Sequence, residues 1–155
     1  MRTLDQVVLE SAMFAGLDAR YAEQLAGCSQ TVGFDAGETL FREGEPADVF
    51  YVLRRGRVAL ELYVPGRGPL TIETIEAGEV VGWSWLFPPH TWHFDARAVA
   101  PVRAVAVDGA CIRGKCDDDP ALGFELMRRF SSVLLERLNA TRFRLANLYG
   151  GPDGR

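Results

Sequence analysis

Regularly spaced glycines are the feature that most constrains the fold of this chain. Through residues 31 to 81 they cut the sequence into short runs rich in β-branched and aromatic residues. The turn glycines are Gly37, Gly44, Gly56, Gly66, Gly68 and Gly78. Turns about eight to twelve residues apart are typical of antiparallel sandwiches and barrels. The pattern predicts strands over residues 32–34, 39–41, 50–53, 58–64, 70–75 and 80–81, a hairpin tip at 65–68, and two further strands over 96–101 and 102–108.

Helical patterns flank this β-rich segment on both sides. Apolar residues at helical spacing predict a first short helix over residues 4–14, and Asp18 is a suitable cap for a second that stops at Gly27. Near the other end, Asp119 followed by Pro120 is typical of a helix start, and no glycine or proline interrupts residues 124–149. We therefore expect an α+β fold: N-terminal helices in residues 1–30, an antiparallel β-roll or jelly roll in 31–116, and one long helix in 117–150, together forming a single domain.

The long helix carries a repeat that is typical of helix pairing. Residues at alternating spacings of four and three form a coiled-coil seam: Met127, Ser131, Leu134, Leu138, Thr141, Leu145 and Leu148. A second apolar row faces elsewhere: Leu122, Phe124, Phe130, Val133 and Phe143. We expect a homodimer through this helix, and the alternative is that both rows pack within one subunit.

Charge and cysteine content exclude several classes of protein. The net charge of −4 argues against a general binder of nucleic-acid backbones. No signal peptide is expected, because the N-terminus has no long apolar run, and no membrane span is expected, because no apolar run in the sequence reaches the required length. The three cysteines, an odd number, do not suggest a disulfide framework, so we expect structural thiols in a reducing cytoplasm. A Cys111–Cys116 pair is the alternative.

One segment concentrates the rarest side chains of the chain. Residues 82–98, GWSWLFPPHTWHFDARA, hold all three tryptophans and both histidines. Indoles supply apolar walls with directional N–H donors, and imidazoles supply polar contacts, which together suit a ligand pocket. The last two predicted strands begin at the end of this segment, so it belongs to the predicted β-roll.

The residues resemble the cyclic nucleotide-binding domain family, as found in the catabolite activator protein and its relatives. FDAGETLFREGEPADVFYVLRRGRVAL (34–60) is similar to that family's opening motif, with Gly37, Gly44 and Gly56 at its turn glycines. EAGEVVGWSWLF (76–87) is similar to the approach to its phosphate-binding cassette, and residues 129–148 are similar to its dimerising helix. The resemblance covers residues 4 to 148.

The resemblance implies a ligand site in the cassette, from which this sequence departs. In the family a glycine is followed by a glutamate that binds the ribose hydroxyl, and an arginine further along pairs with the cyclic phosphate. Gly82 is kept here, but Trp83 stands at the glutamate position and Trp92 at the arginine position, with His93 beside it. The helix position that contacts the base matches Thr141, and Arg142 follows it.

These replacements argue against standard cyclic AMP binding, because a desolvated phosphate needs a fixed cation. Arg142 is the expected replacement cation. Arg97 also lies close, but its strand position suits a surface or structural ion pair.

Three hypotheses follow for the tryptophan segment. The first is a remodelled pocket for a planar or apolar small molecule carrying one anionic group, formed by Gly82, Trp83, Ser84, Trp85, Trp92, His93, Thr141 and Arg142. The second is a filled, silent pocket in a protein-interaction or scaffold module. The third is a metal or haem sensor using His90, His93 and Asp95.

The first hypothesis makes the chain a stand-alone sensor that signals through its long helix to a downstream protein. No Ser-His-Asp arrangement and no phosphate loop with its lysine occur, so we expect no enzyme and no resident cofactor. Because the sequence stops soon after the long helix, no DNA-binding domain and no direct DNA contact are expected.

Overall fold

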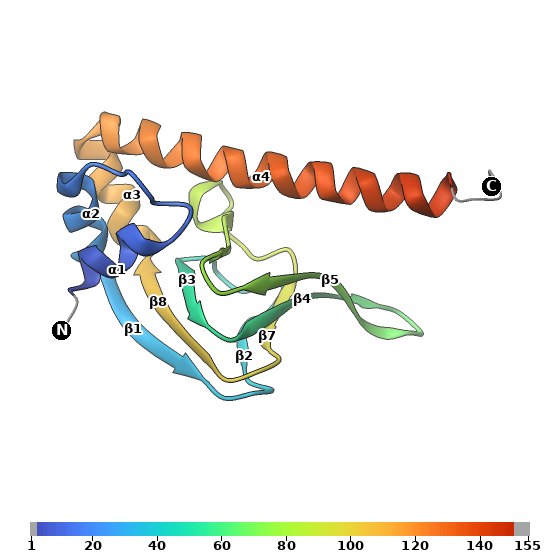
Figure 1. Cartoon of the computed structure of the whole chain (residues 1–155). Coiled ribbons are helices and arrows are strands. Elements are labelled where there is room, and N and C mark those ends of the chain that lie inside the picture. The colour runs from blue at the N-terminus through green and yellow to red at the C-terminus, as the bar shows by residue number, and fades with distance from the viewer. Residues whose placement is uncertain (1–2, 151–155) are drawn as a thin grey trace.

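The structure, a computed structural model, describes residues 3–150 as eight strands flanked by helices (Figure 1). The helices are α1 (Leu4–Glu10), α2 (Ala19–Ala26), α3 (Gly109–Asp118) and α4 (Pro120–Tyr149), with a short 3-10 helix, η1 (Ser84–Leu86). The strands are β1 (Ser29–Phe34), β2 (Thr39–Phe41), β3 (Val49–Arg55), β4 (Arg57–Val64), β5 (Gly68–Glu76), β6 (Val80–Val81), β7 (Asp95–Ala98) and β8 (Val102–Asp108). No helix within residues 3–150 combines the length and apolarity of a membrane span.

The strands form two antiparallel four-stranded sheets, which confirms the predicted β-roll. The first sheet has the order β1-β8-β3-β6 and the second the order β2-β7-β4-β5. All the predicted strands are present, and the predicted hairpin tip joins β4 to β5, where Arg67 N–H donates to the carbonyl of Val64. This hairpin projects from the roll beneath the outer end of α4 (Figure 1).

Two clusters of buried residues hold these layers together. One lies between the first sheet and the helices and is centred on Phe14, Phe50, Trp85 and Phe130. The other lies inside the roll and includes Phe41, Leu60, Ile75 and Trp92. Strand β8 serves both, because alternate residues point to opposite faces: Val105 and Val107 join the first cluster, whereas Ala104 and Ala106 join the second.

Gly56 shows why the predicted turns require glycine. Its φ of 94° lies in the left-handed region, and a Cβ there would lie 2.3 Å from the carbonyl oxygen of Pro101. Any side chain would push the β3–β4 turn away from the segment that precedes β8. The glycine therefore fixes how closely the two sheets join at this corner.

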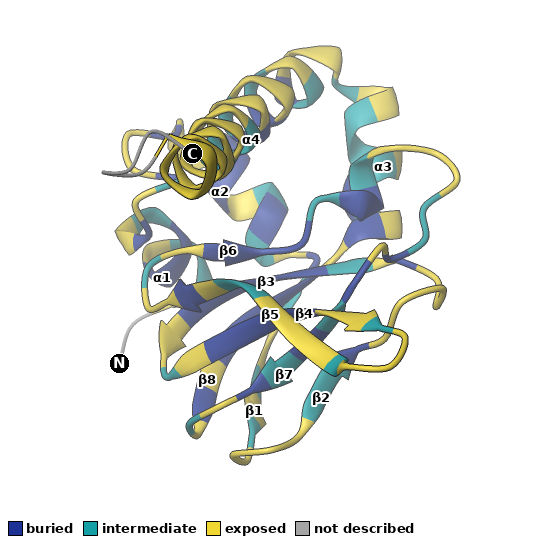
Figure 2. Cartoon of the chain, turned by 90° about the vertical axis from the view of Figure 1, so that its right-hand side faces the viewer, coloured by how far each residue is buried: buried dark blue, intermediate teal, exposed yellow. Residues whose placement is uncertain are grey.

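The long helix begins where the sequence predicted. The Asp119 carboxylate accepts a hydrogen bond from Leu122 N–H at 3.4 Å, and Pro120 takes the first helical position. Its 30 residues span about 45 Å at 1.5 Å per residue. Leu122, Leu126 and Phe130 are buried in the first cluster, and residues 138–150 are exposed (Figure 2).

A helix that the sequence did not predict, α3, precedes it. The Asp108 carboxylate caps it by accepting from Cys111 N–H at 3.0 Å. Gly109 is buried there, and a Cβ on it would lie 2.8 Å from Cβ of Trp85. Two glycines within this ten-residue helix weaken the helical pattern, which is why the sequence predicts residues 109–116 as part of the roll.

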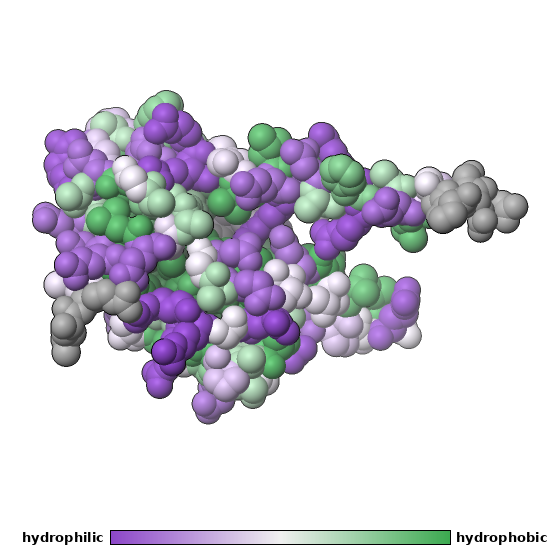
Figure 3. Space-filling view, viewed as in Figure 1, coloured by the Kyte–Doolittle hydropathy of each residue, from purple (hydrophilic) through white to green (hydrophobic). Residues whose placement is uncertain are grey.

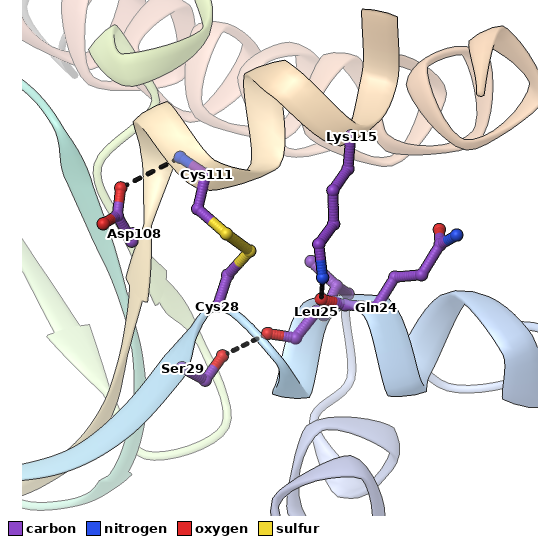
Figure 4. Close-up of a disulfide and its surroundings, with 7 residues drawn as sticks. All are labelled: Gln24, Leu25, Cys28, Ser29, Asp108, Cys111 and Lys115. Carbon is purple, nitrogen blue, oxygen red and sulfur yellow. Dashed lines mark hydrogen bonds between the residues drawn. A yellow bond between two sulfur atoms is a disulfide. The ribbon is translucent and has the colours of Figure 1, made fainter. Parts of the chain in front are cut away.

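The expectation of three thiols is wrong, because Cys28 and Cys111 form a disulfide (Figure 4). Cys28 lies between α2 and β1, Cys111 lies in the first turn of α3, and their Cα atoms are 5.8 Å apart. Pairing of β1 with β8 brings the two together: Asp108 N–H donates to the carbonyl of Cys28 at 2.8 Å. A separation of 83 residues hides this pairing from the sequence. Cys116 is free and partly buried, so the alternative Cys111–Cys116 pair is also wrong.

Candidate ligand site between the β4–β5 hairpin and α4

A groove of about 710 Å³ runs between the β4–β5 hairpin and the second half of α4. The gap between helix and hairpin is visible on the right of Figure 3. Ten of the fifteen lining residues are aliphatic or aromatic: Leu60, Leu62, Leu70, Ile72, Trp83, Phe94, Leu134, Leu138, Leu145 and Leu148. The polar ones are Thr71, Glu73, Arg137, Thr141 and Arg144. The volume is in the usual range of small-molecule sites, about 300–1,000 Å³.

Trp83 forms the inner wall of this groove. It follows Gly82 at the end of β6, packs edge-on against Phe94 with ring centroids 6.1 Å apart, and stays partly exposed. The guanidinium of Arg137 lies over the Trp83 ring, 4.8 Å from its centroid. An aromatic face with a cation fixed against it suits a ligand that is apolar and bears a negative charge.

Arg137 is the charged residue buried deepest in the groove. Its side chain is 12% exposed; Nη2 donates to the carbonyl of Val80 at 2.8 Å, and Nε lies 3.4 Å from Oε1 of Glu73. Burial lowers the pKa of Arg137 below its usual value, whereas the nearby carboxylates of Glu73, Glu79 and Glu136 act in the opposite direction. Its Nη1 is buried without a hydrogen-bond partner among residues 3–150. A buried donor without an acceptor carries a desolvation penalty.

Arg144 and Thr141 close the outer part of the groove. Arg144 Nη1 donates to the carbonyl of Ile72 on β5 at 2.8 Å, and its Nη2 lies 3.3 Å from the hydroxyl of Thr141. That hydroxyl donates to the carbonyl of Arg137 within the helix at 2.9 Å. Thr141 thus lines the groove with its hydroxyl donor already used, and Arg144 connects α4 to the hairpin.

Trp92, in contrast, fills the cassette from inside the roll. It is 2% exposed and stacks on Phe41 with ring centroids 3.6 Å apart. A Cβ on Gly82 would lie 2.6 Å from Cη2 of its indole, and Gly82 has a φ of 98°. The indole therefore rests on the glycine where the resemblance implied a phosphate site. The expectation that Trp92 lines a ligand pocket is not met, because its ring belongs to the core.

Trp85 and Ser84 are likewise core residues rather than pocket residues. Trp85 is fully buried between Phe50 and Phe130, at ring-centroid distances of 4.9 and 5.2 Å. Ser84, which is 5% exposed, begins the 3-10 turn that carries Trp85 into this cluster. The 3-10 turn that follows Trp83 thus separates the two indoles: Trp83 lines the groove, and Trp85 packs into the cluster beneath the helices.

The remaining predicted site residues lie outside the groove. His93 and Arg142 are exposed and neither lines the groove, whereas the sequence predicts Arg142 as the cation of the site. Thr141 and Arg142 are adjacent, but a turn of about 100° per residue points Arg142 away. Asp95 accepts a hydrogen bond from Glu43 N–H at 2.8 Å. Within residues 3–150, no three His, Cys, Asp or Glu side chains are placed to hold a metal.

Arg97 has the structural role that its strand position suggested. Its Nε and Nη2 donate to the two carboxylate oxygens of Glu61 on β4, at 3.1 and 3.0 Å. This pair raises the pKa of Arg97 through the hydrogen bond and the charge of Glu61. Arg97 is thus engaged across β4 and β7, and it does not line the groove.

Arg137 and Arg144 are the site residues that the sequence analysis missed. The sequence predicts the cation of the site at Arg142 instead. Arg129, Arg137 and Arg144 fall eight and seven residues apart, which places them on one side of α4, and each donates to backbone carbonyls of the roll or the N-terminal turn. This spacing places the arginines on the side of α4 that also carries the buried Leu122, Leu126 and Phe130, and it could have identified them from the sequence.

Comparison with known proteins agrees with this architecture. The family model described as cyclic nucleotide-binding domain matches residues 31–119. A "CRP-like cAMP-activated global transcriptional regulator" of Mycobacterium tuberculosis is 28% identical over 94% of this chain, which spans 63% of that relative's length.

Two solved structures are similar over most of the chain. One, described as a cyclic nucleotide-binding protein from Geobacter metallireducens GS-15, is 30% identical with a TM-score of 0.78, over 89% of this chain and 99% of the other. The N-terminal domain of a transcriptional regulator from Streptomyces coelicolor A3(2) is 25% identical with a TM-score of 0.69, over 87% and 94%. The chain belongs to the cyclic nucleotide-binding domain family.

Proposed function

We propose that this chain is a regulatory sensor module that binds a small, largely apolar anion in the groove between the β4–β5 hairpin and α4. The observation that carries the proposal is the largely buried guanidinium of Arg137, which lies against the Trp83 ring in a mostly apolar groove. The family supports a regulatory role, because the curated relative is described as cAMP-activated.

The lining indicates the chemistry of the ligand. Arg137 and Arg144 bring two positive charges and Glu73 brings one negative charge, so the groove favours a ligand with one negative charge. The aliphatic walls and Trp83 favour an apolar or aromatic body. A cyclic nucleotide is more polar than these walls, and Trp92 fills the cassette beside Gly82. We therefore propose a ligand other than a standard cyclic nucleotide.

Helix α4 would transmit the effect of ligand binding to a partner. Leu134, Leu138, Leu145 and Leu148 line the groove from the helix side, and the last three are at least 47% exposed. A ligand that bridges hairpin and helix would favour one helix position over another, which shifts the population of states presented to a twin helix or a downstream protein. Homodimerisation, a downstream protein partner, the absence of direct DNA contact and a cytoplasmic location all stay predictions.

A scaffold module with a filled pocket is the second candidate. The observation that favours it is the burial of Trp85 and Trp92, which occupy the interior on both sides of the cassette. On that hypothesis the hairpin groove would accept a protein segment rather than a small molecule.

Isothermal titration calorimetry with 8-anilinonaphthalene-1-sulfonate, an aromatic monoanion, tests the proposal against cyclic AMP and cyclic GMP. We expect the sulfonate probe to bind more tightly than either nucleotide. Arg137→Gln should weaken that binding about tenfold or more, since a hydrogen bond to a charged group contributes about 1.5–3 kcal/mol.

Arg142→Gln is the matched control, because Arg142 lies on the same helix outside the groove and the change in net charge is identical. Equal affinities for the two variants would contradict the proposed site. Tight cyclic AMP binding that survives Arg137→Gln would show that the cassette still works despite Trp92. No binding by any probe would favour the scaffold hypothesis.

A further inference from the structure

A second hollow, of about 660 Å³, lies where α1 meets the outer face of β1, β8 and β3. It shares no lining residue with the hairpin groove. Val7 and Ser11 form its helix side, Thr31 and Gly33 its floor on β1. Figure 3 shows strongly hydrophilic side chains beside and below the N-terminal helices. The proposed function does not use this region.

Three arginines line the hollow: Arg54, Arg55 and Arg103. No side-chain hydrogen bond or ion pair joins any of these guanidinium groups to another residue in the stretch 3–150. Arginines elsewhere on the strands and α3 behave differently: Arg57, Arg97 and Arg113 each pair with a carboxylate at 3.0 Å. Glu10 also lines the hollow, so three positive charges face one negative charge.

The strand register places two of these arginines directly opposite each other. Arg55 on β3 is paired with Arg103 on β8, and Arg103 is paired in turn with Gly33 on β1. Like charges opposite each other on neighbouring strands destabilise a sheet. A chain with a net charge of −4 thus gathers unpaired positive charge at one point.

Gly33 leaves the space that Arg103 uses. A Cβ at this position would lie 3.2 Å from Nη1 of Arg103 and 3.7 Å from its Cδ, so the arginine extends across the glycine. The guanidinium of Arg103 therefore lies over β1 at Gly33 rather than pointing away from the sheet. An arginine held in this way presents its fork of donors to an incoming anion.

We propose that this hollow is a second ligand site, for a small molecule carrying at least two linked phosphate groups, such as a diphosphate. Guanidinium groups bind phosphate oxygens in a bidentate manner, and a multiply charged anion would neutralise the facing arginines. A volume in the small-molecule range and an overall negative chain favour a compact anion over a nucleic-acid backbone.

Calorimetric titration of the full chain with pyrophosphate, at constant ionic strength, tests this site. We expect pyrophosphate to bind at least tenfold more tightly than orthophosphate. The double variant Arg55→Gln/Arg103→Gln should lose at least tenfold in affinity, whereas Arg42→Gln/Arg67→Gln, which removes two exposed arginines elsewhere, should not. Gly33→Val should also weaken binding, although it keeps every charge.

Equal affinity of the two double variants, or no preference over orthophosphate, would overturn the proposal. A single-stranded 20-nucleotide DNA that binds more tightly than pyrophosphate, with the same dependence on Arg55 and Arg103, would also overturn it in favour of a nucleic acid. Arg137→Gln should leave pyrophosphate binding unchanged, so failure of this site and failure of the hairpin groove are distinguishable.

Discussion

At the residue scale, the three tryptophans have two different structural roles, although they lie in one short segment. Trp85 and Trp92 fill the interior on either side of the cassette, and only Trp83 faces the groove. The cluster itself was visible in the sequence, but the division was not, because it depends on the turn at Gly82 and the stacking partner Phe41. Proximity in the sequence predicts that these side chains lie near each other, but it does not predict which of them points into the core and which into the groove.

Gly82→Ala tests how the cassette is filled. Its Cβ would lie 2.6 Å from the indole of Trp92, a rigid ring stacked on Phe41, so the substitution carries both backbone strain and overpacking. Gly66→Ala is the matched control: its φ is 82°, and nothing lies within 4 Å of the added Cβ. We expect chemical denaturation to show about 1–3 kcal/mol more destabilisation at Gly82. Equal losses would show that Trp92 does not rest on this glycine.

At the element scale, the sequence predicted the β-roll and the long helix well because both depend on local signals. Turn glycines set the strands, and Asp119 with Pro120 set the helix start. Helix α3 was not predicted, because its sequence has weak helical propensity. The Cys28–Cys111 disulfide was not predicted either, because only the pairing of β1 with β8 brings the two cysteines together. The contacts of Arg129, Arg137 and Arg144 on α4 were not predicted, because the carbonyls that accept their hydrogen bonds belong to segments distant in the sequence.

The disulfide should stabilise the N-terminal helices against α3. Closing a loop across 83 residues restricts the unfolded chain, with an expected contribution of about 2–5 kcal/mol. Cys111→Ser should lower the free energy of unfolding by that amount and abolish any effect of a reductant, whereas Cys116→Ser should keep the reductant effect. Thiol titration of the denatured, unreduced protein should find one thiol, and three would contradict the disulfide.

At the scale of the whole molecule, α4 is both a wall of the groove and an uncovered apolar surface. Five of the seven seam residues line the groove, and the helix also exposes Phe124, Leu135, Phe143 and Tyr149, each more than half exposed. We expect a homodimer at micromolar concentration by light scattering, weakened by Met127→Arg, which lies in the seam but outside the groove. A monomeric mass for the unmodified chain would refute the pairing prediction.

Ligand binding at the hairpin–helix groove rather than in the cassette can be followed by the three indole N–H signals in a ¹H–¹⁵N spectrum. Each tryptophan reports on one location: Trp83 on the groove, Trp92 on the cassette and Trp85 on the helical core. On titration with 8-anilinonaphthalene-1-sulfonate, the signal of Trp83 should shift in a saturable manner while those of Trp85 and Trp92 stay in place. A shift of the Trp92 signal without a shift of the Trp83 signal would instead show that the ligand binds in the cassette.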